Sequence, residues 1–337
     1  MQIVTLSFLL IAALVPQLMA ENTINLPTIG EIVRVDSKLD QLVGPDARIE
    51  VLASGFDWSE GPVWVPRDGG YLLFSDVPQN TIFKWQAGKG ITIFLKPSGF
   101  TGVGSYSSEP GSNGLALDRE GRLICCEHGD RRISVMPWGE GKRTLASNWE
   151  GKWFNSPNDV ACRSNGDVYF TDPPYGLPSR EPDEVQGYGG CGVFRIANSG
   201  EVSLLTREMT RPNGIAFSPD EKTLYVAQSD SSAPIIRAFD VNDDGTVGNS
   251  RIFYDVSSEY GKQKGSPDGM TIDTKGNLFA TGPGGVHVIT PDGKLLGRID
   301  TGEATANCTW GDDGSVLYIT ADMYLCRVQT RTKGIGW

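Results

Sequence analysis

Six residues with a side-chain oxygen recur along the chain in comparable settings. Each opens a short apolar segment, which is followed by a tight turn and then a second apolar segment. The six are Glu60, Asn113, Asn158, Asn213, Asp268 and Asn307. Carboxylate and amide oxygens are hard ligands that suit Ca²⁺ or Mg²⁺ better than the metals that prefer thiolate or imidazole. If the fold gathers these side chains, they can hold a divalent cation.

The spacing of these six residues predicts the fold that would gather them. Residues 266–280 show the repeated unit in full, and neighbouring units begin 39 to 55 residues apart. Repeats of this length, made of short strands with Gly-containing turns, are typical of a β-propeller. Six copies predict an all-β, six-bladed propeller. Because the first strand of each blade lines the central channel, the six oxygens would face one axis, with a metal in that channel.

The same residues also have a purely structural interpretation. Asn-Gly and Asp-Gly are ordinary turn dipeptides, so any one of these side chains could simply form a turn. Turn formation does not require Glu60, however, because glutamate is a poor turn former. For the set as a whole we favour a metal site.

Composition limits the possible partners. The chain has 337 residues and a formal net charge of −11, which disfavours nucleic acid and anionic membrane surfaces. We predict a small-molecule partner and no membrane contact for the mature chain. The oligomeric state stays open, and a monomer is compatible with the sequence. The six cysteines have no metal-binding spacing, and we favour buried thiols over disulfides, although export would permit pairing.

The chain divides into three predicted parts. Residues 1–20 combine an apolar run with a small residue at Ala20, which indicates a signal peptide and export to the periplasm or beyond. A membrane anchor is the alternative, but the run is shorter than the roughly 20 residues of a span. Residues 21–47 are predicted as an N-terminal arm and 48–337 as a single propeller. A strand at 48–53 should pair with 324–328 and complete the last blade.

Two loops and one histidine are further candidates for the site. The segments 97–112 and 173–190 are long for blade connections, so we expect them to form the rim of a pocket. His128 and His287 are the only histidines. His128 follows the first loop, and we predict it as a general acid or base, against the alternative of a structural hydrogen-bonded role.

Several motifs together resemble a known family. The segments 59–64, 155–160, 169–176, 211–214 and 266–269 are similar to those of the gluconolactonase/regucalcin-like (SMP-30/gluconolactonase/LRE-like) six-bladed propellers, bacterial-type gluconolactonases above all. The resemblance covers roughly residues 50 to 330. It implies a metal held by Glu60, Asn158, Asn213 and Asp268, with Ca²⁺ expected and Mg²⁺, Mn²⁺ or Zn²⁺ as substitutes.

The resemblance also implies roles in binding and catalysis. Asn113, Asn158 and Tyr175 would face the substrate, and Asp268 would activate water, while Asn307 would line the pocket at most. The expected activity is metal-dependent hydrolysis of sugar lactones such as glucono-δ-lactone. The alternatives are a phosphotriesterase resembling diisopropylfluorophosphatase, another lactonase or esterase, and a non-catalytic calcium-binding propeller.

Overall fold

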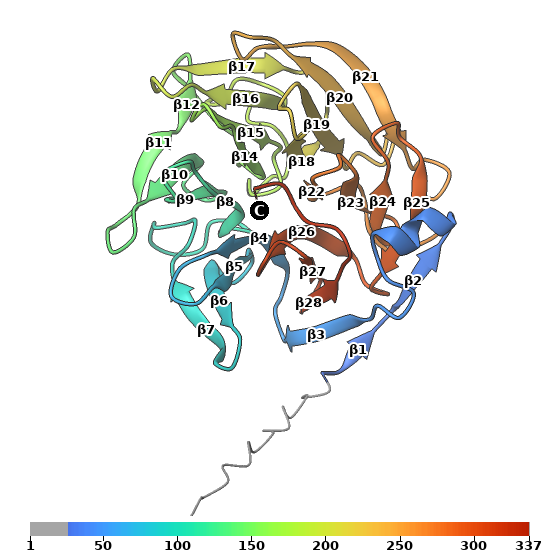
Figure 1. Ribbon diagram of the computed structural model, residues 1–337. Coiled ribbons are helices and arrows are strands. Elements are labelled where there is room, and N and C mark those ends of the chain that lie inside the picture. The colour runs from blue at the N-terminus through green and yellow to red at the C-terminus, as the bar shows by residue number, and fades with distance from the viewer. Residues whose placement is uncertain (1–25, 337) are drawn as a thin grey trace, which may run out of the picture.

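A computed structural model describes residues 26–336 and arranges six antiparallel sheets around a central axis (Figure 1). The first strand of each sheet lies nearest the axis. These inner strands are β4 (Ser59–Val65), β8 (Ser112–Leu117), β14 (Val160–Cys162), β18 (Pro212–Phe217), β22 (Met270–Ile272) and β26 (Thr305–Gly311). The prediction of an all-β, six-bladed propeller is confirmed.

The remaining strands follow outward in chain order within each blade. They are β5 (Tyr71–Asp76), β6 (Thr81–Gln86) and β7 (Gly90–Leu95) in blade one; β9 (Leu123–Glu127), β10 (Arg132–Met136) and β11 (Arg143–Ala146) in blade two; β15 (Val168–Asp172), β16 (Gly192–Ile196) and β17 (Val202–Thr206) in blade three; β19 (Thr223–Gln228), β20 (Ile235–Val241) and β21 (Val247–Asp255) in blade four; β23 (Leu278–Gly282), β24 (Gly285–Ile289) and β25 (Leu295–Asp300) in blade five; β27 (Val316–Ala321) and β28 (Tyr324–Gln329) in blade six. A small pair, β12 (Asn148–Trp149) and β13 (Lys152–Trp153), stands apart.

The N-terminal segment closes the ring. Strand β3 (Ile49–Ser54) pairs with β28, as predicted, and β1 (Thr28–Ile29) pairs with β3. Strand β2 (Glu31–Arg34) adds a fifth strand to blade five by pairing with β25. A short 3₁₀ helix (Ser37–Gln41) follows and buries Leu39 in the core between blades five and six. Residues 26–47, predicted as an arm, thus cover the outer edges of two blades.

Apolar side chains fill the spaces between neighbouring blades. Trp64 of blade one stacks on Tyr318 of blade six with ring centroids 5.5 Å apart. Tyr169 and Phe217 join blades three and four at 4.8 Å. Aromatic pairs at these distances add to the burial of apolar area and lock the angle between blades.

Two other predictions concern the cysteines and the leader. All six cysteines lie within the described residues and are free thiols, five of them buried, so the interpretation as buried thiols is confirmed. The predicted signal peptide at 1–20 lies outside the described residues. Between residues 26 and 336, no helix is long and apolar enough to cross a membrane.

Replacing Ile49 tests whether β3 closes the ring. Its side chain is 2% exposed and packs in the core of blades five and six, so Ile49→Ala should lower the free energy of unfolding by about 2–4 kcal/mol. The matched control is Ile93→Ala on β7, where the side chain is 62% exposed and the loss should stay within about 0.5 kcal/mol. Equal stabilities in urea unfolding would contradict a closing role for β3.

Candidate active site

A polar cavity of about 390 Å³ opens at one end of the channel. Five of the six predicted oxygen-bearing residues line it: Glu60, Asn113, Asn158, Asn213 and Asp268. Tyr175 lines it too, so the structure brings together every predicted metal-binding and substrate-binding residue. Four of the five oxygen-bearing side chains are almost fully buried, and Asp268 is partly exposed.

Irregularities in the inner strands turn these side chains toward the axis. The register of β4 against β5 shifts between Glu60 and Val63, and that of β18 against β19 shifts between Pro212 and Ile215. Strand β8 has the same irregularity around Asn113. A bulge of this kind bends the strand and redirects a side chain, which is why bulges are common beside functional sites.

Glycine follows the oxygen-bearing residue in four blades because the inner strands approach one another closely. A Cβ on Gly214 would lie 2.1 Å from the carbonyl oxygen of Asp268 in the next blade. A Cβ on Gly61 would lie 2.0 Å from the carbonyl oxygen of Asn113, and its φ of +47° also favours glycine. No larger residue fits at either position, so the spacing of the ring depends on these glycines.

Hydroxyl groups then fix three of the ring positions to the blade before them. Ser75 Oγ donates to the Asn113 carbonyl oxygen at 2.8 Å, and Thr171 Oγ1 donates to that of Asn213 at 2.7 Å. Ser229 Oγ donates to the carbonyl oxygen of Pro267, next to Asp268, at 2.6 Å. Each bond joins two blades at the point where a ring side chain begins, so the ring is held by the whole propeller.

The side chains of the ring leave oxygens free for a cation. Asn213 Nδ2 donates to Ser229 Oγ at 2.9 Å, which leaves its Oδ1 without a competing bond. Asp268 Oδ1 is buried and has no hydrogen-bond partner among residues 26–336. A buried carboxylate oxygen without a partner raises the free energy of the folded state unless it binds a cation or accepts a hydrogen bond.

The pKa values of the two acidic side chains, Glu60 and Asp268, also fit a cation site. Burial raises the pKa of Glu60 to about 8, against a hydrogen bond from the Gly61 N–H. Burial also raises the pKa of Asp268 well above its usual range, and the neighbouring Glu60 carboxylate raises it further. Two like charges in one buried cavity disfavour ionisation, and a divalent cation between them would reverse this effect.

The donor set fits a hard divalent cation. Among residues 26–336 there is no cluster of three or more His, Cys, Asp or Glu side chains suited to a metal. A cation in this cavity would therefore combine the two carboxylates with the amide oxygens of Asn158 and Asn213. An all-oxygen set of this kind is typical of Ca²⁺ and Mg²⁺ sites.

The rim loops contribute residues that the sequence pattern did not single out. Glu109 from the loop 97–112 and Arg180 from the loop 173–190 both line the cavity. Arg180 Nη2 lies 3.1 Å from Glu109 Oε1. Both loops were predicted as a pocket rim, but nothing in their composition marked these two residues among the other charged ones.

His128 does not line the cavity. Its ring is fully buried, and Nδ1 lies 3.2 Å from the Glu109 carbonyl oxygen. Because a carbonyl only accepts, Nδ1 carries the proton, and Nε2, which has no partner among residues 26–336, is unprotonated. Burial lowers the pKa of His128 to about 4, so the ring is neutral near pH 7. This placement matches the structural alternative better than the predicted acid–base role.

His287 is also buried and contacts Pro283 and Tyr254.

Asn307 lines the cavity at the other end of the channel. The register of β26 shifts between Thr305 and Asn307, so Ala306 occupies the bulge that holds Asn113 in β8. Asn307 is therefore one residue further along, and successive strand residues point to opposite sides. Asp159 follows Asn158 in the same way. Both residues line a second cavity, so Asn307, which was expected to line the pocket at most, does not line the first.

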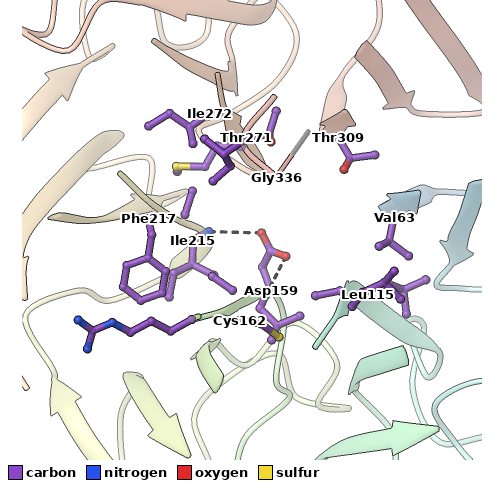
Figure 2. A pocket seen from close by; sticks show the side chains of 18 of the residues that line it. Val63, Leu115, Asp159, Cys162, Ile215, Phe217, Thr271, Ile272, Thr309 and Gly336 are labelled. Atoms are coloured by element: carbon purple, nitrogen blue, oxygen red, sulfur yellow. Dashed lines mark hydrogen bonds between the residues drawn. The ribbon is translucent and has the colours of Figure 1, made fainter. Parts of the chain in front are cut away.

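The second cavity is larger, about 550 Å³, and mostly apolar (Figure 2). Val63, Leu115, Ile215 and Phe217 surround its one buried carboxylate, Asp159. Asp159 accepts hydrogen bonds from the N–H groups of Val160 at 2.9 Å and Ile215 at 3.3 Å, drawn as dashed lines. Burial raises the pKa of Asp159 to about 7. Since the unpaired polar groups converge in the smaller cavity, we assign the candidate active site there.

Comparisons with known proteins agree with this architecture. A family model described as "SMP-30/Gluconolactonase/LRE-like region" matches residues 58–322. A gluconolactonase of Zymomonas mobilis subsp. mobilis is 41% identical over 323 residues, which cover 94% of this chain and 90% of the relative. The pentonolactonase XacC of Haloferax volcanii is 27% identical over 269 residues, covering 77% and 80%. A solved gluconolactonase structure from Xanthomonas campestris superposes with a TM-score of 0.79 at 31% identity, covering 90% of this chain and 97% of that one.

The fold and the ring of oxygens define a propeller hydrolase scaffold with a polar channel site. The chain belongs to the SMP-30/gluconolactonase/LRE-like family. Both the recognised family and the prediction of a gluconolactonase-like enzyme are confirmed.

Metal titration of Asp268→Asn tests the electrostatics of the ring. With a chelator present, the variant should melt at or above the wild-type temperature, because removing Asp268 relieves its repulsion with Glu60. Saturating CaCl₂ should raise the wild-type melting temperature by about 4 °C or more and the variant's by much less. Asp292→Asn, in an exposed turn, is the control and should respond like the wild type. Equal calcium shifts in all three proteins would contradict a cation at Asp268.

Proposed function

We propose that the protein hydrolyses sugar lactones such as glucono-δ-lactone with the help of a divalent cation, Ca²⁺ by preference. The observation that carries the proposal is the orphaned Asp268 oxygen in a cavity whose other side chains present carboxylate and amide oxygens. The relatives named as gluconolactonase and pentonolactonase favour a lactone over the phosphoester alternative.

Glu60, Asn158, Asn213 and Asp268 would hold the cation. When bound, such an ion supplies a Lewis acid that polarises the lactone carbonyl. A carboxylate has two oxygens, so Asp268 can contribute one to the ion and use the other as a base. The Asn113 side chain has no hydrogen-bond partner within residues 26–336 and can donate its amide N–H to the carbonyl oxygen as negative charge develops.

Asp268 can carry out both proton transfers of the reaction. Asp268 takes a proton from the attacking water, whose oxygen bonds to the carbonyl carbon. The bond from that carbon to the ring oxygen breaks, and the ring oxygen leaves as an alcohol after Asp268 returns the proton. The product is an open-chain hydroxy acid. His128 has no part in this scheme, because its ring does not reach the cavity.

Hydrolysis of glucono-δ-lactone, followed by proton release near pH 7, tests the proposal. The wild type should be active, lose activity in EDTA and regain it when Ca²⁺ is restored. Asp268→Asn should lower kcat by at least about 100-fold, whereas Asp292→Asn should leave it unchanged. Full activity in EDTA, or wild-type rates in Asp268→Asn, would overturn the metal-and-base mechanism.

We also propose that the chain is exported and loses residues 1–20. The apolar run before Ala20 supports this proposal. Expressed in a bacterium with a periplasm, the protein should be found outside the cytoplasm with Glu21 as its first residue. N-terminal sequencing checks this, and an unprocessed chain in the cytoplasm would contradict it.

A further inference from the structure

An ion pair joins the two rim loops at the wall of the active-site cavity. Arg180 Nη2 lies 3.1 Å from Glu109 Oε1, and the Arg180 guanidinium lies over the ring of Tyr175, 5.9 Å from its centroid. All three residues line the cavity. Arg180 is the only basic side chain among the described residues of that wall.

Neither member of the pair uses its full bonding capacity. A guanidinium carries five N–H donors and a carboxylate has two acceptor oxygens. Within residues 26–336, the only close polar contact of either side chain is the one between them. The Glu109 side chain is 21% exposed and that of Arg180 50% exposed, so both border the open part of the cavity. The pair therefore presents further donors and acceptors side by side.

The backbone holds both residues in place. His128 Nδ1 donates to the carbonyl oxygen of Glu109 at 3.2 Å, and the Gly129 N–H donates to that of the following Pro110 at 3.1 Å. Arg180 has a φ of +56°, which is uncommon for a residue other than glycine. Its N–H donates to the Leu177 carbonyl oxygen at 3.0 Å, which fixes this turn. This turn conformation and its hydrogen bond define where the Arg180 side chain leaves the loop.

We propose that the Glu109–Arg180 pair binds neighbouring hydroxyl groups of the substrate and selects polyhydroxylated lactones over unsubstituted ones. This inference rests on the proposed lactonase function. A hydroxyl group can donate to Glu109 while its neighbour accepts from Arg180, and the face of Tyr175 suits the C–H side of a sugar ring. An unsubstituted lactone would remove water from the pair without replacing its hydrogen bonds, and such sites discriminate strongly.

Two lactones that differ in their hydroxyl groups test the proposal. For wild type, Glu109→Gln and Arg180→Gln, kcat/KM is measured on glucono-δ-lactone and on δ-valerolactone, which has no hydroxyl groups. The ratio of the two values should fall by at least about tenfold in each variant. Arg143→Ala is the matched control, because Arg143 forms an exposed ion pair with Glu140 far from the cavity, and its ratio should equal that of the wild type.

The outcomes separate this inference from the proposed function. If the wild type hydrolyses neither lactone, the lactonase function itself fails. If the wild type is active but the ratio of kcat/KM values is unchanged in Glu109→Gln and Arg180→Gln, the pair does not select hydroxylated substrates. Equal losses of activity on both lactones would be such a result.

His128 provides an independent readout, since it acts on the pair through the Glu109 carbonyl. As a positioning residue, His128→Ala should lower the ratio of kcat/KM values, and His128→Asn should restore part of it by supplying an N–H in place of Nδ1. Equal losses on both lactones would instead support the proton-donor role that the sequence suggested and would overturn the positioning role.

Discussion

Two acidic side chains share one cavity, and the cost of ionising them there is the constraint on which the rest of the site depends. Glu60 lies on the first blade and Asp268 on the fifth, so no local element can hold them together. Closure of the ring does so: β3 completes blade six, and the hydroxyl groups of Ser75 and Thr171 join neighbouring blades. Without a cation the burial raises both pKa values. A bound cation would favour the ionised forms and lower both pKa values.

One repeated unit produces two chemically different cavities because strand residues alternate in direction. The residues at the bulges face the polar cavity, and the residues immediately after them face the interior of the channel. At the position directly after the bulge residue, four blades carry glycine, and the other two carry Asp159 and Asn307. Small residues therefore lie at the inner end of the polar cavity, and the larger cavity beyond it is lined mainly by apolar residues of the inner strands. Volume alone would have favoured the other end of the channel.

The sequence predicted best those positions where the fold and the chemistry of the site both require the same type of residue. The repeat of short strands predicted six blades, and five of six oxygen-bearing positions converge as expected. Asn307 was misplaced because a shift of one residue in a bulge cannot be seen in a pattern of apolar and polar residues. Glu109 and Arg180 were missed for a different reason: they meet across 71 residues of chain, and only the packing of two loops brings them together. His128 occupies the junction of those loops, where its ring nitrogen supports a backbone carbonyl.

Different residues line the two cavities. None of residues 26–336 lines both, and Arg180 belongs to the active-site cavity alone. Tyr175 and Arg180 lie together in the wall of the active-site cavity, with the guanidinium 5.9 Å from the ring centroid. Hydrolysis of a lactone yields a carboxylate, and Arg180 is the one basic side chain among the described residues of this wall. Its positive charge would attract that product, so departure of the product, and not only arrival of the substrate, would depend on the rim.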